Sequence, residues 1–207
     1  MADVPTIVKI KSIEPLDQPR LRETLEKVLE HAASHFEQVN YCLVGTAAAM
    51  LHGVPLSAAG DVDFLMKERT HVDAFAVALS SFPALTPPTL LEGAKQYYAA
   101  YNVNAIKVEA STVEVTTDSV YIETFGDGPW KYQTLIAVGP YRVPTVALEL
   151  RLATELLRNR PDRYEPMITW MKQNGCDADL LGHAMKARRL SPEIQHSILA
   201  QVSGGAV

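Results

Sequence analysis

The sequence predicts an α+β fold: a mixed β-sheet flanked by helices, followed by a C-terminal helical bundle. In the first part of the chain, amphipathic helical patterns alternate with short apolar runs that end at glycine or proline. Alternating apolar and polar residues then follow over 96–116. Beyond residue 142 only helical patterns remain. We therefore expect an α/β core over residues 1–142 and a helical bundle over residues 143–207 that packs on this core.

The composition is that of an ordinary folded domain. The chain has 207 residues, of which 47% are hydrophobic and 21% charged, and its formal net charge is -5. This charge argues against a chain that is basic throughout and binds nucleic acid over a wide surface. The two cysteines, Cys42 and Cys176, lie far apart and indicate neither a disulfide framework nor a zinc site. The sequence shows no signal-peptide core and no run of about 18 apolar residues, so we expect a cytoplasmic protein with no membrane partner.

The elements of the core are expected in alternating order. A helix over 19–36 carries leucines and valines at helical spacing on one side and charged residues on the other. The other expected elements are strands at 6–10, 41–44 and 61–67, helices at 46–52 and 70–82, a proline-rich loop at 83–88, extended chain over 96–116, and strands at 120–124 and 135–138. The apolar residues change parity near Ser111, which predicts a bulge or bend there.

The helical part is expected to begin after Ala147. Leucines recur there at helical spacing and indicate a first helix of about 13 residues. Further helices are expected over 163–173, 177–187 and 192–202. Arginines follow in and after the first helix, and we expect them to lie mainly on a solvated face with Glu155 and Asp162 as partners: Arg151, Arg158, Arg160 and Arg163.

The most informative stretch runs from Tyr41 to Met66. An apolar run ends at Gly45, which precedes a short helix of small residues. Glycine allows a phosphate to approach the backbone closely, the first N–H groups of a helix favour an anion, and the Thr46 hydroxyl offers a further contact. Gly45 and Thr46 are therefore candidates for binding phosphates, with an ordinary strand-to-helix turn as the alternative.

Two aspartates, Asp61 and Asp63, lie in the next apolar run. Residues i and i+2 of a strand point to the same face, so the two carboxylates are expected to project together. Adjacent carboxylates repel each other, and burying them unpaired is costly. Oxygen ligands favour a hard ion, so the pair predicts a magnesium site. Two solvent-facing residues on an edge strand are the alternative.

A third carboxylate from a neighbouring strand would complete such a site, and two metal ions could then be held. Glu109 is the first candidate because it lies in an apolar frame, Glu114 is the second and Glu123 the third. A surface glutamate on a half-exposed strand is the alternative for Glu109. Lys107 lies on the same strand face as Glu109 and is expected to pair with it.

Taken together, these residues resemble the signature of the nucleotidyltransferase superfamily of the polymerase-β type. Val44-Gly45-Thr46 stands where that family has a hydrophobic residue followed by Gly-Gly or Gly-Ser. Gly60-Asp61-Val62-Asp63-Phe64 stands where it has its paired aspartates, and Val108-Glu109-Ala110 where it has its third acidic strand. The helical part is similar to the bundle of nucleotidyltransferase toxins of abortive-infection type. Thr46 departs from the family pattern, and so does the absence of an arginine from residues 55–60.

The resemblance implies a mixed sheet flanked by helices and a magnesium-dependent enzyme that moves a nucleoside monophosphate from an NTP to an acceptor hydroxyl. The residues that it implies are Asp61, Asp63 and Glu109 for catalysis and metal binding, and Gly45, Thr46, Arg151 and Arg158 for binding the NTP. Two alternatives stay open: a non-catalytic member that binds nucleotide or is purely structural, and a toxin-like enzyme acting on tRNA or protein. The expected acceptor is a small molecule, a tRNA or a protein, and a second copy of the chain is a further expected partner.

Overall fold

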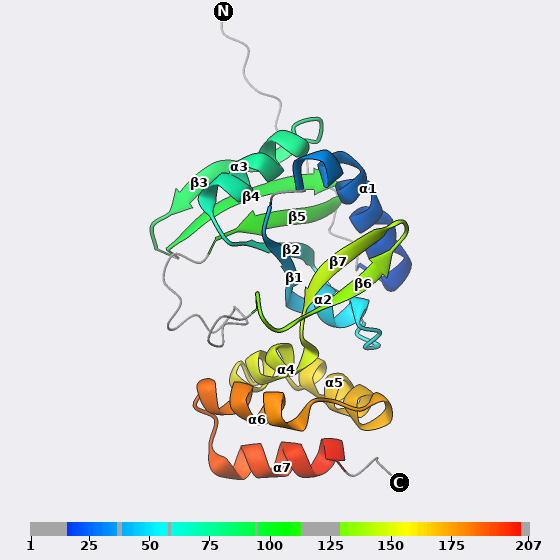
Figure 1. The fold of residues 1–207 in the computed structure, drawn as a ribbon, viewed down its shortest axis with the longest axis vertical. Helices are drawn as coiled ribbons and strands as arrows, with labels where there is room; N and C mark the ends of the chain where they lie inside the picture. The colour runs from blue at the N-terminus through cyan, green and yellow to red at the C-terminus, as the bar shows by residue number, and fades with distance from the viewer. Residues whose placement is uncertain (1–15, 37–38, 58, 94, 113–128, 204–207) are drawn as a thin grey trace, which may run out of the picture.

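The computed structural model describes residues 16–36, 39–57, 59–93, 95–112 and 129–203, and it shows a sheet with helices packed on it and a stack of helices beyond it (Figure 1). The strands expected at 6–10 and 120–124 lie outside the described residues, as do Glu114 and Glu123. Within the described residues the α+β class is confirmed.

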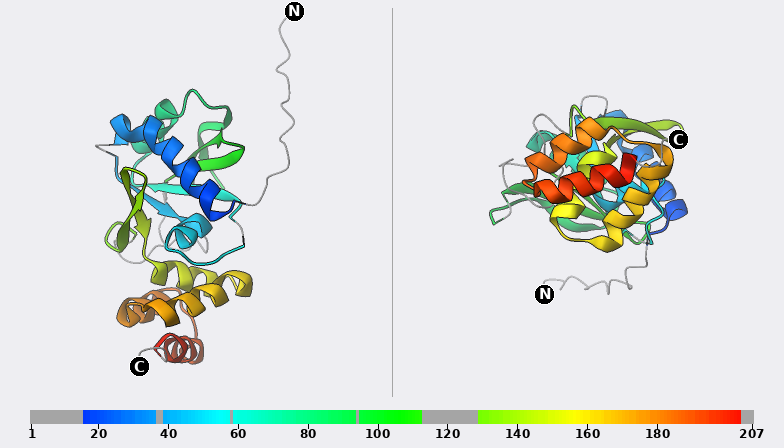
Figure 2. Two further views of the ribbon diagram at one scale, coloured as in Figure 1. Left: turned by 90° about the vertical axis from the view of Figure 1, so that its right-hand side faces the viewer. Right: turned by 90° about the horizontal axis from the view of Figure 1, so that it is seen from below.

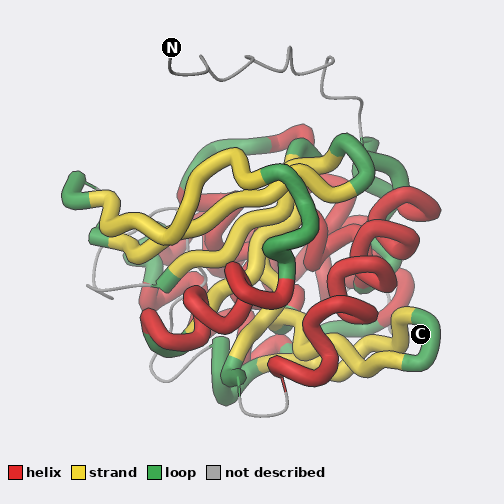
Figure 3. Tube along the Cα trace, turned by 90° about the horizontal axis from the view of Figure 1, so that it is seen from above, coloured by secondary structure: helices red, strands yellow, loops and turns green. Residues whose placement is uncertain are grey.

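Seven strands of the described chain form one mixed sheet in the order β3-β4-β5-β2-β1-β7-β6. They are β1 (Tyr41–Val44), β2 (Asp61–Met66), β3 (Ala84–Leu91), β4 (Gln96–Val103), β5 (Ile106–Ser111), β6 (Gln133–Val138) and β7 (Tyr141–Val146). The central strand β2 pairs antiparallel with β1 and parallel with β5, and β1 pairs parallel with β7. Seen from above, the strands lie side by side in a twisted layer (Figure 3).

Three helices of the described residues lie in the sheet part of the molecule: α1 (Gln18–Phe36), α2 (Gly45–Leu51) and α3 (Arg69–Ala78). The apolar face of the sheet packs against α3 through a row of aromatic rings. The Phe75 ring of α3 lies 5.7 Å from Phe64 of β2 and 6.1 Å from Tyr101 of β4, measured between centroids. Burying a phenylalanine side chain stabilises a fold by about 1.5–3 kcal/mol, so this row fixes β2 with one face toward the core.

The helical part consists of α4 (Leu148–Leu157), α5 (Pro161–Asn174), α6 (Ala178–Ala187) and α7 (Pro192–Ser203). These helices stack below the sheet, with α4 nearest to it and α7 farthest away (Figures 1 and 2). Helix α4 contacts α2, α5 and α6, and α7 packs on α5 and α6. Within the described residues, every helix is too short or too polar to span a lipid bilayer.

The junction between the two parts is short. β7 ends at Val146 and α4 begins at Leu148, so Ala147 alone separates them. The Ala147 N–H donates a hydrogen bond to the Tyr132 carbonyl at 2.9 Å, which ties the junction to the chain just before β6. β7 crosses the boundary expected at residue 142, and the division of the chain into two units stays a prediction.

The proline-rich segment at 83–88, expected to be a loop, belongs largely to a strand, so that expectation is wrong. β3 pairs antiparallel with β4 at the edge of the sheet, and its register shifts on both sides of Thr86. An edge strand tolerates Pro87 and Pro88 because proline removes a backbone donor that only a central strand needs on both sides.

The extended chain expected over 96–116 is a hairpin as far as the structure describes it. Asn104 and Ala105, both with positive φ, form the turn between β4 and β5. β5 ends at Ser111, where the bend was expected. The sequence pattern did not indicate β7, because Pro144 interrupts its alternation of apolar and polar residues.

Candidate active site

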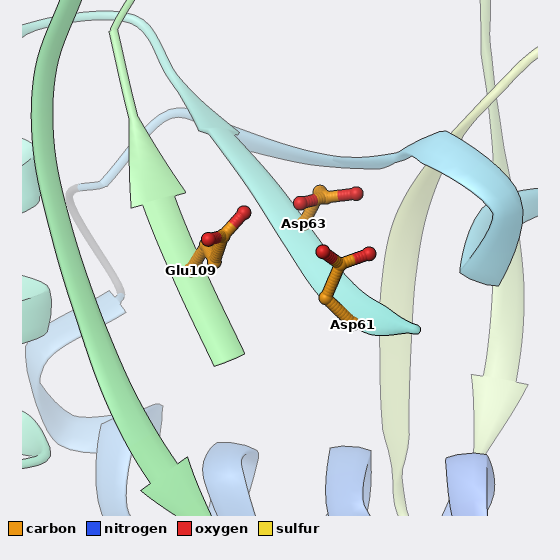
Figure 4. A group of neighbouring side chains, drawn as sticks. All are labelled: Asp61, Asp63 and Glu109. Atoms are coloured by element: carbon orange, nitrogen blue, oxygen red, sulfur yellow. The ribbon is translucent and has the colours of Figure 1, made fainter. Parts of the chain in front are cut away.

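Strand β2 places Asp61 and Asp63 on one face of the sheet, as their spacing predicted. Both aspartates are partly exposed, whereas Val62 and Phe64 between and beyond them are buried on the opposite face. Figure 4 shows both carboxylates projecting from the strand to the same side. The aromatic row behind β2 therefore determines which way the two acids point.

Glu109 joins them from the neighbouring strand. β5 runs parallel to β2, and in their register Glu109 lies directly opposite Asp63. One ligand oxygen from each of Asp61, Asp63 and Glu109 lies within 4.8 Å of the other two. We call these three residues the acidic group. Of the three candidates for the third carboxylate, Glu109 is the one that the described structure brings to this place.

Lys107 and Tyr98 hold the Glu109 carboxylate. Lys107 Nζ lies 2.6 Å from Glu109 Oε1 and 3.2 Å from Asp61 Oδ2, so the expected Lys107–Glu109 ion pair is present. The Tyr98 hydroxyl, on β4, donates a hydrogen bond to the same Glu109 oxygen. Positively charged and neutral donors thus orient an acid that would otherwise be repelled by its neighbours.

The pKa values of the two facing acids are shifted in opposite directions. Burial, the charge of Asp61 and the interaction with Glu109 raise the pKa of Asp63 well above its ordinary value. Burial alone would also raise the pKa of Glu109, but hydrogen bonds from Asp63, Lys107 and Tyr98 outweigh it and lower this pKa. Glu109 is therefore the more readily ionised member of the pair.

The acidic group fits a divalent metal ion. Its donors are three carboxylates, the hard oxygen ligands that Mg²⁺ and Mn²⁺ prefer. They converge from two neighbouring strands whose pairing fixes their spacing. Asp61, Asp63 and Glu109 are therefore the residues that could hold a metal.

Gly45 lies against the acidic group, next to the Asp63 carboxylate. It begins α2 directly after β1, and its φ of 73° lies in the left-handed region that favours glycine. A methyl group at this position would overlap the Asp63 carboxylate. A glycine is thus required here both for the backbone conformation and for the approach of Asp63.

Three arginines converge on Glu155 on the helical side. Arg151 and Glu155 are one turn apart in α4 and form an ion pair, with side chains only 2% and 0% exposed. Arg158 Nη1 lies 3.1 Å, and Arg163 Nη1 3.4 Å, from the same Glu155 oxygen. The expectation that these residues lie on a solvated helix face is therefore wrong for Arg151 and Glu155, because that face of α4 is turned inward.

Among the described residues, guanidinium groups outnumber carboxylates in the arginine cluster. One glutamate faces three guanidinium groups, those of Arg151, Arg158 and Arg163. Burial, together with the charges of Arg160, Arg151 and Arg158, lowers the pKa of Arg163, which reflects this crowding. Arg160 itself is turned away and pairs with Asp162 at 2.9 and 2.6 Å, as expected from the sequence.

A single pocket of about 340 Å³ lies between the acidic group and the arginine cluster. Its lining residues are Val44, Gly45, Thr46, Asp61, Asp63, Leu65, Gln96, Tyr98, Glu109, Ser111, Arg151, Arg158 and Arg163. A larger hollow of about 500 Å³ lies between α5 and α7, but its charged lining residues are Glu165 and Glu193 alone. Of these two hollows, the smaller one is lined by charges of both signs and is the better candidate for acting on a ligand.

Solved structures resemble this chain, although no family model matches it and no curated protein matches its sequence. A candidate nucleotidyltransferase from Thermotoga maritima aligns over 78% of this chain and 98% of its own, with 18% identity and a TM-score of 0.52. An antigenic nucleotidyltransferase-like protein from Paracoccidioides brasiliensis aligns over 91% of this chain and 95% of its own, with 14% identity and a TM-score of 0.53. The antibiotic-resistance factor ANT(2'')-Ia aligns over 89% of this chain and 100% of its own, with 10% identity and a TM-score of 0.50.

The chain has the nucleotidyltransferase fold. At these identities the likeness concerns the fold, and it agrees with the fold that the sequence motif implied. In this nucleotidyltransferase fold, all seven residues predicted for catalysis, metal or NTP binding line the same pocket: Gly45, Thr46, Asp61, Asp63, Glu109, Arg151 and Arg158.

Other residues of the pocket were not predicted. Tyr98, Gln96 and Ser111 come from the β4–β5 hairpin, and Arg163 comes from α5. The alternation of residues 96–111 signalled which side chains share a face, but only the pairing of β4 with β5 places Tyr98 beside Glu109. Arg163 was expected on a solvated face with Glu155 among the acidic partners; this pair is present, but only the packing of α5 on α4 brings Arg163 to the pocket.

Two further residues, which do not line the pocket, have structural roles. His52 follows α2, and its Nε2 lies 2.8 Å from the Val146 carbonyl oxygen. The Asp177 carboxylate accepts a hydrogen bond from the Leu180 N–H and caps α6.

Proposed function

We propose that this protein is a magnesium-dependent nucleotidyltransferase that moves a nucleoside monophosphate from an NTP to an acceptor hydroxyl. The observation that supports this proposal is that the acidic group and the arginine cluster line opposite sides of one pocket. A ligand that suits both sides carries phosphates toward the arginines and a metal ion toward the carboxylates. The fold shared with nucleotidyltransferases supports the same function by analogy.

The acidic group would hold one or two Mg²⁺ ions through Asp61, Asp63 and Glu109. When bound, the metal supplies positive charge that stabilises the phosphoryl group during an in-line displacement. Asp61 and Asp63 are held in place from behind by the buried face of β2, and Glu109 by the hydrogen bond from Tyr98. This preorganisation is the main contribution that the protein residues make to such a reaction.

The NTP phosphates would lie between Gly45 and the helical side of the pocket. Gly45 has no side chain to block their approach, and the Thr46 hydroxyl is beside it. Arg158 and Arg163 have side chains 21% and 23% exposed, so they can reach a ligand, whereas Arg151 is buried behind them. We therefore assign phosphate contact first to Arg158 and Arg163, with Arg151 adding positive charge to the pocket wall.

The proposed reaction is a substitution at the α-phosphorus. The acceptor hydroxyl oxygen forms a new bond to this phosphorus, the bond to the bridging oxygen breaks, and pyrophosphate leaves. The proton of the hydroxyl passes to the Glu109 carboxylate, which is ionised at neutral pH and lies beside Asp63 on the neighbouring strand. Holding the two reactants in line contributes most of the rate, because few groups besides Glu109 take part chemically.

Binding and transfer can be tested separately. Calorimetry with non-hydrolysable NTP analogues and Mg²⁺, starting with ATP, measures binding by the wild type and by Asp63→Asn. The matched control is Asp73→Asn, an aspartate on α3 whose carboxylate accepts a hydrogen bond from Tyr97 outside the pocket. We expect wild type and Asp73→Asn to bind alike and Asp63→Asn to bind poorly. Failure of the wild type to bind every common NTP would overturn the proposal.

Transfer is measured with α-labelled NTPs and a cell extract separated into small molecules, RNA and protein. Label entering one of these fractions identifies the acceptor class, and Asp63→Asn should abolish it. Binding of NTP without transfer to any fraction would instead support the non-catalytic alternative. Growth arrest upon expression that Asp63→Asn abolishes would support a toxin-like enzyme.

A further inference from the structure

Lys107 lies between two carboxylates of the acidic group. Its Nζ is 2.6 Å from Glu109 Oε1 and 3.2 Å from Asp61 Oδ2. The sheet register fixes this position, because Lys107 lies directly opposite Asp61 on the parallel strand and two residues before Glu109 on the same face. Its side chain is 34% exposed, so most of it is held within the site.

An ammonium group and a divalent cation compete for these oxygens. Mg²⁺ binds oxygen ligands at about 2.1 Å, and a lysine in hydrogen-bond contact with the same carboxylates would lie against the metal with like charge. Coulomb repulsion between groups of like charge is strong in a partly buried site, where water screens it less than at the surface. Lys107 therefore has to move away when Asp61 and Glu109 bind a metal together.

We propose that Lys107 is an internal counter-ion that occupies the acidic group before the metal binds and sets its affinity for the metal. This inference rests on the proposed function, since the same group is the proposed metal site. In the metal-free protein, Lys107 offsets the repulsion among Asp61, Asp63 and Glu109. A divalent ion that displaces Lys107 must break its ion pairs with Asp61 and Glu109. The metal therefore binds more weakly than it would to the same three carboxylates without the lysine.

This arrangement couples metal binding to the nucleotide. Because Lys107 weakens the affinity for the ion alone, the site fills effectively only when an NTP brings its own phosphate oxygens to the same ion. The displaced ammonium is a point charge on a flexible stem and can then face a phosphate. Lys107 is thus a positioning residue whose effect is exerted through the metal.

The test measures the binding of Mn²⁺ alone, without nucleotide, by calorimetry and by electron paramagnetic resonance of the free ion. The variants are Lys107→Met, which removes the charge at nearly constant length, and Lys107→Arg, which keeps it. The matched control is Lys95→Met, because Lys95 is also paired with a glutamate, Glu92 at 3.9 Å, but in an exposed turn. We expect Lys107→Met to bind Mn²⁺ about three- to tenfold more tightly than wild type, the scale of two partly exposed ion pairs.

Lys107→Arg and Lys95→Met should show no gain in affinity. Equal or weaker binding of Mn²⁺ by Lys107→Met would overturn the inference. Lys107→Gln, with a polar side chain, provides a second neutral variant should the methionine variant fold poorly, and it should show the same gain.

Asp63→Asn separates the two proposals. If this variant loses Mn²⁺ binding while Lys107→Met binds as wild type does, the metal site stands and only the role of Lys107 is wrong. If wild type, Asp63→Asn and Lys107→Met all fail to bind Mn²⁺, the metal site of the proposed function is wrong, and the role of Lys107 falls with it.

Discussion

Gly45 and Asp63 are in direct contact, with no space for a side chain between them. The antiparallel pairing of β1 with β2 creates this contact, because Val44 lies opposite Asp63 and Gly45 turns across it into α2. The φ of Gly45, 73°, brings the turn close to the carboxylate. The glycine of the turn and the aspartate of the neighbouring strand therefore depend on each other.

Replacing Gly45 with alanine should disturb both the turn and the acid. Positive φ costs an alanine roughly 1–2 kcal/mol of folding free energy, and the added methyl group also forces the Asp63 carboxylate aside. We expect Gly45→Ala to lower the free energy of unfolding in urea and to lose most of its Mn²⁺ and NTP binding.

Gly175→Ala is the control for the backbone effect alone. Gly175 also has positive φ, 85°, but a Cβ there would meet no atom within 4 Å. It should lose similar stability and keep its binding. Normal Mn²⁺ binding by Gly45→Ala would show that metal binding does not depend on the present position of the Asp63 carboxylate.

Removing the Tyr98 hydroxyl should slow transfer without unfolding the protein. This hydroxyl donates to the Glu109 carboxylate, and a hydrogen bond to a charged group contributes about 1.5–3 kcal/mol. We expect Tyr98→Phe to lower kcat about tenfold or more, since each tenfold corresponds to about 1.4 kcal/mol, with little change in KM for the NTP.

Tyr97→Phe is the matched control for Tyr98→Phe. The Tyr97 hydroxyl donates to Asp73 at 2.8 Å on the exposed side of the hairpin, so its loss should leave kcat unchanged. Equal kcat values for the two variants would mean that the position of Glu109 does not depend on Tyr98.

Glu155→Gln should destabilise the helical part strongly. This substitution removes the negative charge that Arg151, Arg158 and Arg163 share, and it leaves the buried Arg151 without that partner. Removing one partner of a buried ion pair typically costs about 3–5 kcal/mol. Urea unfolding followed by circular dichroism measures this loss.

Asp162→Asn breaks the exposed pair with Arg160 and serves as the control for Glu155→Gln. Exposed ion pairs contribute little to stability, so its unfolding midpoint should match that of the wild type. A Glu155→Gln variant as stable as Asp162→Asn would mean that the ion pairs with Glu155 contribute little to the stability of the helical part.

His52 should make stability depend on pH. Burial lowers its pKa below the ordinary value of 6.5, against the opposing effects of the Val146 carbonyl and the charge of Glu149. The unfolded chain therefore takes up a proton more readily than the folded protein, so the stability contributed by neutral His52 is present above pH 6.5 and decreases as the pH falls below it.

Urea unfolding at several pH values tests this expectation. Between about pH 7 and pH 5, the range in which histidine titrates, the free energy of unfolding of wild type should decrease more steeply than that of His52→Gln. Parallel pH curves for the two proteins would contradict the expected role of His52.

Local patterns were sufficient to predict the acidic half of the site. The spacing of Asp61 and Asp63 fixes their common face in any strand, and Gly45 marks a strand end whatever the strand pairs with. Glu109 could be ranked above Glu114 and Glu123 because apolar residues flank it in an alternating pattern. Its position beside Asp63, however, follows from the parallel pairing of β5 with β2. That pairing joins strands far apart in the sequence, and no local pattern specifies it.

The helical half of the site was predicted less well. Helical spacing places Arg151 and Glu155 on one face of α4 but does not tell which face is turned inward. They are buried because α4 lies between the sheet part and the other helices, an arrangement of tertiary packing. β3 was not predicted for a related reason. Its prolines argue against a central strand, and only the order of all the strands shows that β3 lies at the edge of the sheet, where proline is tolerated.

Because only Ala147 separates β7 from α4, the connection leaves little chain length for the two sides of the pocket to move apart. The Ala147 N–H is also bonded to the Tyr132 carbonyl, so a movement of α4 away from the sheet would have to break this hydrogen bond or carry β6 and β7 with it. We expect that lengthening this connection by a few glycines would leave both sides folded but would no longer hold the carboxylates opposite the arginines.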